Sequence, residues 1–139
     1  MLFCSLLVTF SLSQVGFPAG NLKIGLDEKG YFTELSDTSS GRNYLRADTL
    51  APLISIISGD QRIFPGRLDY NNTKKTVSVF FLEINASVEI SVTLRNTHLV
   101  LEVVNAEPAE LIDGLVWGPI PLTISKIVGE VIGVVRDDE

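Results

Sequence analysis

The sequence has very few residues that bind metals or form cross-links: one cysteine, one histidine and one tryptophan in 139 residues. A disulfide framework needs paired cysteines, and zinc fingers need several Cys or His ligands, so the composition excludes both. The sequence also lacks the G-x-S-x-G turn of serine hydrolases and the glycine-rich loops that hold phosphates. We therefore expect no metal ligands and no cofactor.

Basic residues are also scarce. Lys and Arg number 11 against 17 Asp and Glu, which gives a formal net charge of -6. Because nucleic-acid binding depends on a positively charged face, a nucleic-acid partner is not expected. Half of the acidic excess lies in the terminal Asp137-Asp138-Glu139, so the rest of the chain is only mildly acidic.

The sequence is rich in residues that favour β-strands: 14 Val, 12 Ile and 9 Thr, about a quarter of the chain. Apolar residues make up 45% and charged residues 20%, an ordinary balance for a folded domain. A chain of this length can form one domain with a sizeable core. The composition therefore predicts a single all-β domain.

The first 13 residues, MLFCSLLVTFSLS, are uncharged and strongly apolar. They are too few to span a bilayer, which takes about 20 apolar residues. Small residues at Ser11 and Ser13 favour signal-peptidase cleavage before Gln14, although no Lys or Arg precedes the apolar run. We interpret residues 1–13 as a signal peptide and expect a secreted, periplasmic or cell-surface protein without a membrane span. The alternative is a buried first strand.

Short apolar segments separated by turn residues follow along the chain, as in a β-sandwich or barrel. Apolar and polar residues alternate over Leu22–Leu26, and Asp27–Gly30 has the composition of a hairpin turn that leads into a strand over Tyr31–Ser36. Leu53–Ser58 is a short apolar run with the length of a buried strand.

The middle of the chain has the clearest pattern. Apolar residues recur at every second position over Ala86–Leu94 and Leu99–Val104, and Arg95–His98 joins the two segments. The preceding segment, Thr76–Ile84, changes phase at Phe80-Phe81, as a β-bulge would cause. Together these segments predict an antiparallel meander with one face in water.

After Pro108 the pattern is less regular. Leu115–Trp117 predicts a short strand, which the prolines of the following Gly-Pro-Ile-Pro segment end. Apolar spacing favours a short helix near residues 122–129, and Val131–Arg136 predicts a last strand. Because the β-rich sequence stops abruptly, we expect the 14–139 domain to be an antiparallel β-sandwich that is incomplete at its carboxyl end.

No catalytic residue is expected. His98 lies in a turn and lacks a neighbour that would orient it as a base, so a solvated position is favoured. Glycoside hydrolysis needs two carboxylates that face each other across a cleft. Nothing in the sequence marks any of the candidate carboxylates as such a pair. The candidates are Asp27/Glu28, Glu83/Glu89, Glu107/Glu110 and Asp137/Asp138.

Aromatic side chains offer the remaining chemistry, since flat rings cover the C–H faces of sugars while polar side chains bond their hydroxyls. The candidate carbohydrate-binding residues are Tyr44 with Arg42, Asn43 and Arg46 beside it, and Trp117. Trp117 has an alternative role in the core. Its apolar neighbours favour that role, with the indole mostly buried and its N–H bonded to a backbone carbonyl.

Several segments resemble a known family. GYFTELSD at Gly30–Asp37, followed by SGRNYL at Ser40–Leu45, resembles the opening of amino-terminal, galactose-mutarotase-like β-sandwich domains of large secreted bacterial carbohydrate-active proteins. Ala51–Ile56 is similar to the next strand of that opening. Val116–Pro119 and Gly129–Asp138 are similar to a later segment of such proteins.

The resemblance implies a supersandwich-like fold, of which this chain would be the first portion, ahead of a glycosidase or polysaccharide lyase domain. Mutarotases use a histidine and a glutamate, and His98 in a turn does not match that pattern, so no catalytic residue carries over. The resemblance implies a non-catalytic domain that supports a catalytic domain downstream in the same chain. The alternatives are a stand-alone carbohydrate-binding module and a surface structural or adhesin-like domain.

Overall fold

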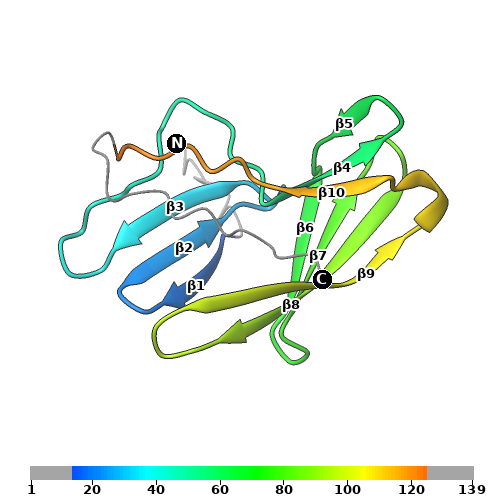
Figure 1. Cartoon of the computed structure of the whole chain (residues 1–139). Helices are drawn as coiled ribbons and strands as arrows, with labels where there is room; N and C mark the ends of the chain where they lie inside the picture. Colours follow the sequence, from blue (N-terminus) through cyan, green and yellow to red (C-terminus); the bar gives the residue numbers. More distant parts are fainter. Residues whose placement is uncertain (1–13, 125–139) are drawn as a thin grey trace, which may run out of the picture.

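Three antiparallel β-sheets make up the described part of the chain, residues 14–124 of a computed structural model (Figure 1). The only helical element among these residues is a short 3₁₀ turn, η1 at Ala109–Leu111. The all-β antiparallel class predicted from the sequence is therefore confirmed. The strands are β1 Val15–Ala19, β2 Leu22–Leu26, β3 Phe32–Asp37, β4 Ile54–Ser58, β5 Gln61–Ile63, β6 Arg67–Asn71, β7 Thr76–Phe81, β8 Ala86–Leu94, β9 Leu99–Glu107 and β10 Gly114–Trp117.

The sheets have the strand orders β1-β2-β3, β10-β4-β5 and β6-β7-β8-β9. Most neighbours are consecutive in the chain. β10 is the exception, because it returns to pair with β4 along the register Gly114↔Ile57 to Trp117↔Ile54. An isolated bridge between Tyr31 and Pro52 connects the start of β3 to the segment that leads into β4. Figure 1 shows β1–β3 on the left and most of the four-stranded sheet on the right, with the β8–β9 hairpin extending to the left beneath β1.

The four-stranded sheet is the predicted meander with one further strand, β6, at its edge. Every second side chain of β7 and β8 points into the core, and the residues between them are less buried, as a sheet with one solvated face requires. The buried residues are Val77, Val79, Phe81, Ala86, Val88, Ile90 and Val92.

Side chains from all three sheets meet in one hydrophobic core. Leu26, Ile56 and Phe81 are examples from the three sheets, and each is almost fully buried. Phe17 of β1 packs edge-on against Tyr70 of β6, with ring centroids 5.1 Å apart. The sheets therefore stabilise one another by burial, the dominant favourable term in folding.

The β2–β3 hairpin forms where the sequence predicts it. The Asp27 carboxylate accepts hydrogen bonds from the backbone N–H groups of Lys29 and Tyr31, each at 2.9 Å. Gly30 has a φ of +95°, which L side chains rarely adopt. The aspartate and the glycine together fix this turn.

Two details predicted from the sequence are wrong. β7 has no bulge at Phe80-Phe81; its pairing is regular on both sides, and the change of phase is the turn that precedes β8. Residues 122–124 of the expected helix are not helical, since Leu122 instead forms a bridge with Leu45. The remainder of that helix and the expected strand Val131–Arg136 lie outside the described residues.

Candidate functional site

The Arg42–Arg46 loop holds four of the predicted sugar-binding residues, and the structure gives one of them a structural role. The Asn43 side-chain oxygen accepts hydrogen bonds from the backbone N–H of Leu35 at 3.1 Å and of Leu45 at 3.0 Å. It therefore holds the loop against β3. This carbonyl oxygen is not free to act as the main acceptor for a ligand hydroxyl.

Tyr44 and Arg42 lie together. The Arg42 guanidinium is 5.3 Å from the centre of the Tyr44 ring, within the range of a cation–π contact. Arg42 is exposed and Tyr44 is half-buried, so the guanidinium covers part of the ring surface that a sugar would need. Arg46 is exposed, and its backbone N–H donates to the Pro121 carbonyl at 3.0 Å.

The prediction that Trp117 is mostly buried, made from its apolar neighbours, is wrong. The Trp117 side chain is 46% exposed. The reason is its position as the last residue of β10, at the end of a strand that pairs with β4 alone. An alternating pattern on a strand at the edge of a sheet does not by itself give a covered face.

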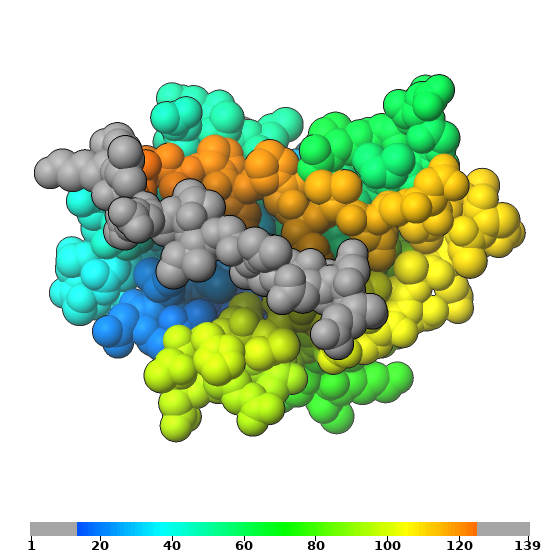
Figure 2. Space-filling model, in the orientation of Figure 1, coloured from blue at the N-terminus to red at the C-terminus, as the bar shows by residue number. Residues whose placement is uncertain are grey.

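Trp117 begins a run of exposed apolar side chains, which we call the apolar strip: Trp117, Ile120, Leu122 and Ile124. Their exposed fractions are 46%, 42%, 39% and 47%. Figure 2 shows this segment, in orange, lying along the surface of the molecule. Single exposed apolar residues are normal, whereas four within eight positions form a candidate contact surface.

Backbone hydrogen bonds hold the apolar strip in place. The Gly118 N–H donates to the Leu53 carbonyl at 3.1 Å, and the Thr123 N–H donates to the Tyr44 carbonyl at 2.8 Å. The strip is therefore attached to the segment before β4 at one end and to the Tyr44 loop at the other. The structure links the Tyr44 loop and Trp117 through this segment.

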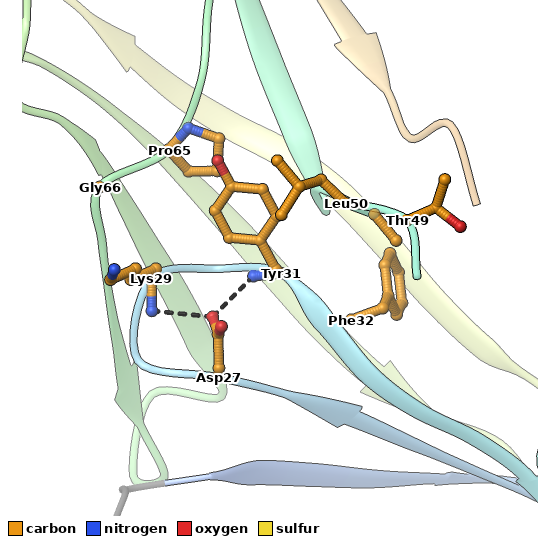
Figure 3. A pocket seen from close by; sticks show the side chains of 9 residues that line it. Asp27, Lys29, Tyr31, Phe32, Thr49, Leu50, Pro65 and Gly66 are labelled. Atoms are coloured by element: carbon orange, nitrogen blue, oxygen red, sulfur yellow. Dashed lines mark hydrogen bonds between the residues drawn. The ribbon is translucent and has the colours of Figure 1, made fainter. Parts of the chain in front are cut away.

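A cavity of about 610 Å³ lies elsewhere, and sequence reasoning missed it. Three separate parts of the chain line it: the β2–β3 turn with the start of β3, residues 49–51, and residues 65–66 (Figure 3). Its polar groups include the side chains of Asp27, Lys29 and Thr49, and its apolar walls include Leu50 and Pro65.

Tyr31 stands in this cavity, with its hydroxyl end near Pro65 and its ring beside Leu50 in Figure 3. Burial and, to a lesser extent, the charge of Asp27 raise the pKa of the Tyr31 phenol above its usual value. The phenol is therefore protonated at neutral pH and can donate a hydrogen bond.

His98 and the acidic side chains of the described residues do not gather into a metal site. Within residues 14–124, no three His, Cys, Asp or Glu side chains come close enough to bind a metal ion. His98 is exposed, with its Nδ1 atom 3.0 Å from the hydroxyl of its neighbour Thr97. Among the same residues, no helix is long and apolar enough to cross a membrane.

Comparison with known proteins does not assign the chain to a family. No family model, no curated protein and no solved structure matches it.

Proposed function

We propose that this chain is a non-catalytic β-sandwich domain of a secreted carbohydrate-active protein and that it supports a glycosidase or lyase domain further along the same chain. The resemblance of the Gly30–Leu45 segment to the opening of such domains motivates the assignment. One structural observation favours a domain that packs against another domain: the exposed apolar strip at Trp117–Ile124.

The position of the apolar strip suits a contact with a following domain. It occupies the last described residues and is therefore close in sequence to a domain that would follow. Covering each of its large side chains contributes about 1 kcal/mol or more, because roughly 25 cal/mol is gained per Å² of apolar surface removed from water. The strip is also firmly placed, since its backbone is bonded to Leu53 and Tyr44.

Two experiments test this proposal. The first is to read the gene beyond codon 139, where the proposal expects a glycosidase or lyase region; a gene without one would overturn it. The second compares Ile120→Ser with Val104→Ser in the longer protein. Val104 is 52% exposed on β9, is not one of the strip residues, and serves as the matched control.

Ile120→Ser should lower the unfolding temperature of the downstream domain and increase protease cleavage at the junction, because it removes an apolar contact between the domains. Val104→Ser should change neither measurement. Equal behaviour of the two variants would show that the strip does not support another domain.

One observation favours a second candidate, a carbohydrate-binding module: the indole of Trp117 is exposed and could stack on a sugar ring. Affinity electrophoresis against a panel of polysaccharides tests it. This candidate expects Trp117→Ala to abolish retention while Tyr70→Ala, a change of an aromatic residue on β6, affects stability instead. Absence of retention of the unmodified protein on every polysaccharide would exclude it.

A further inference from the structure

We propose that the cavity between the β2–β3 turn, residues 49–51 and residues 65–66 is a binding site for one neutral hexopyranose unit of a glycan. This site lies on different residues from the apolar strip, and it uses neither Trp117 nor Tyr44. The inference therefore goes beyond a supporting role for the domain.

The walls of the cavity are fixed before any ligand arrives. The Phe32 N–H donates to the Ala51 carbonyl at 2.8 Å, and the Leu53 N–H donates to the Gly30 carbonyl at 2.9 Å. On the other side, the Leu68 N–H donates to the Glu28 carbonyl at 2.7 Å. Because these bonds join the three lining segments, little ordering entropy is lost on binding.

The size of the cavity suits a small ligand. Its volume of about 610 Å³ lies within the range of about 300–1,000 Å³ that is usual for small-molecule sites. Leu50, which lines the cavity (Figure 3), is largely exposed, so the cavity opens to solvent there, as expected where a sugar is one unit of a longer chain.

The side chains combine an apolar surface with hydrogen-bonding groups. The Tyr31 ring and Leu50 can cover the C–H face of a sugar, and Leu50, at 76% exposed, is the most exposed large apolar side chain of residues 14–124. A bound sugar ring would remove this surface from water. Leu50 is not part of the hydrophobic core or of the partly buried side chains that pack against it.

The polar groups of the lining offer hydrogen-bond partners for sugar hydroxyls. Asp27 uses Oδ1 for the two backbone bonds of the turn, which leaves Oδ2 to accept a bond from a ligand hydroxyl. Lys29 can donate to a neighbouring hydroxyl, and the protonated Tyr31 phenol can donate to a third. An acceptor and donors on one side and an apolar surface on the other suit a neutral sugar, and a flat hydrocarbon would leave these polar groups unpaired.

The test is a nuclear magnetic resonance titration of the ¹⁵N-labelled chain with the methyl glycosides of galactose, glucose and mannose. Each is added to about 20 mM, because a Kd near 1 mM corresponds to only about -4 kcal/mol. We expect at least one glycoside to shift the backbone amides of Lys29–Phe32 and of Leu50. Absence of shifts with all three, or shifts centred on Trp117 or Tyr44, would overturn the proposal.

Variants then distinguish the cavity from other surfaces. Leu50→Ala and Lys29→Gln change exposed side chains outside the core, and each should weaken binding about fivefold or more, which is about 1 kcal/mol. Val104→Ala, at a residue 52% exposed on β9 that does not line the cavity, is the control and should bind as the unmodified protein does. Equal affinity of all variants would contradict the assignment.

Discussion

Arg62 and Gly118, 56 positions apart in the sequence, are joined by a hydrogen bond of 2.6 Å from the guanidinium to the backbone carbonyl. The Nε–H of the same guanidinium donates to the Ser55 hydroxyl at 2.8 Å, and that hydroxyl is 3.3 Å from the Val116 carbonyl. One side chain of β5 thus connects β4 with the end of β10. It fixes the point where the apolar strip begins.

We therefore expect Arg62→Met to destabilise the domain by about 1–3 kcal/mol, because it removes the donor to a buried carbonyl and to the fully buried Ser55. Arg67→Met is the control. Arg67 lies over the Phe80 ring at 3.9 Å on the solvated face, so its loss should cost about 1 kcal/mol or less. Urea denaturation measures both; equal losses would contradict the connecting role of Arg62.

Trp117→Ala and Phe81→Ala should differ clearly in their effect on stability. Phe81 is fully buried, and its truncation should cost about 3–5 kcal/mol. Trp117 is 46% exposed, and its truncation should cost only about 1–2 kcal/mol. Thermal unfolding of the two variants is the measurement. A loss for Trp117→Ala as large as that for Phe81→Ala would show that the indole belongs to the core after all.

Gly20→Ala should be more harmful than Gly59→Ala, although both glycines have positive φ, +63° and +57°. A methyl group at Gly20 would lie 2.8 Å from the Thr97 carbonyl oxygen in the β8–β9 hairpin. A methyl group at Gly59 would have no atom within 4 Å. We expect losses of about 2–4 and about 1–2 kcal/mol respectively. Chemical denaturation tests this difference. Equal losses would mean that the β1–β2 hairpin, which contains Gly20, is not in close contact with the β8–β9 hairpin.

Acidification should affect the β3 end of the first sheet through Asp37. Hydrogen bonds from Ser39, and then from Ser40, hold the pKa of the Asp37 carboxyl below its usual value. The Asp37 carboxyl therefore binds a proton more weakly in the folded state than in the unfolded chain, where it titrates at about pH 3.9. The stabilisation is complete above that pH and is lost as the pH falls through the lower folded value.

Asp37→Asn removes this titration. Thermal unfolding of both proteins between about pH 6 and about pH 3 should show a stability that falls less steeply for Asp37→Asn than for the unmodified chain. Parallel curves would contradict a stabilising role of the ionised Asp37.

The regular strands could be predicted from the sequence because their pattern is local. Alternation over Ala86–Leu94 and the Asp27–Gly30 turn each depend on neighbouring residues, so period and turn chemistry were enough to place them. β5 and β6 are short and rich in polar residues, and β1 is short and contains a glycine and a proline, so their pairing partners define these strands more than their own composition does. They were missed for that reason.

The candidate sites depended on contacts that no local pattern contains. The sequence by itself determined the all-β class, the central meander and the lack of a Cys/His metal site in its composition. Only the tertiary structure decided that Trp117 is exposed, because burial at the end of β10 depends on whether another strand covers it. The cavity likewise arises where the Asp27 turn, Leu50 and Pro65 meet, and the spatial proximity of distant segments is set by packing and long-range hydrogen bonds.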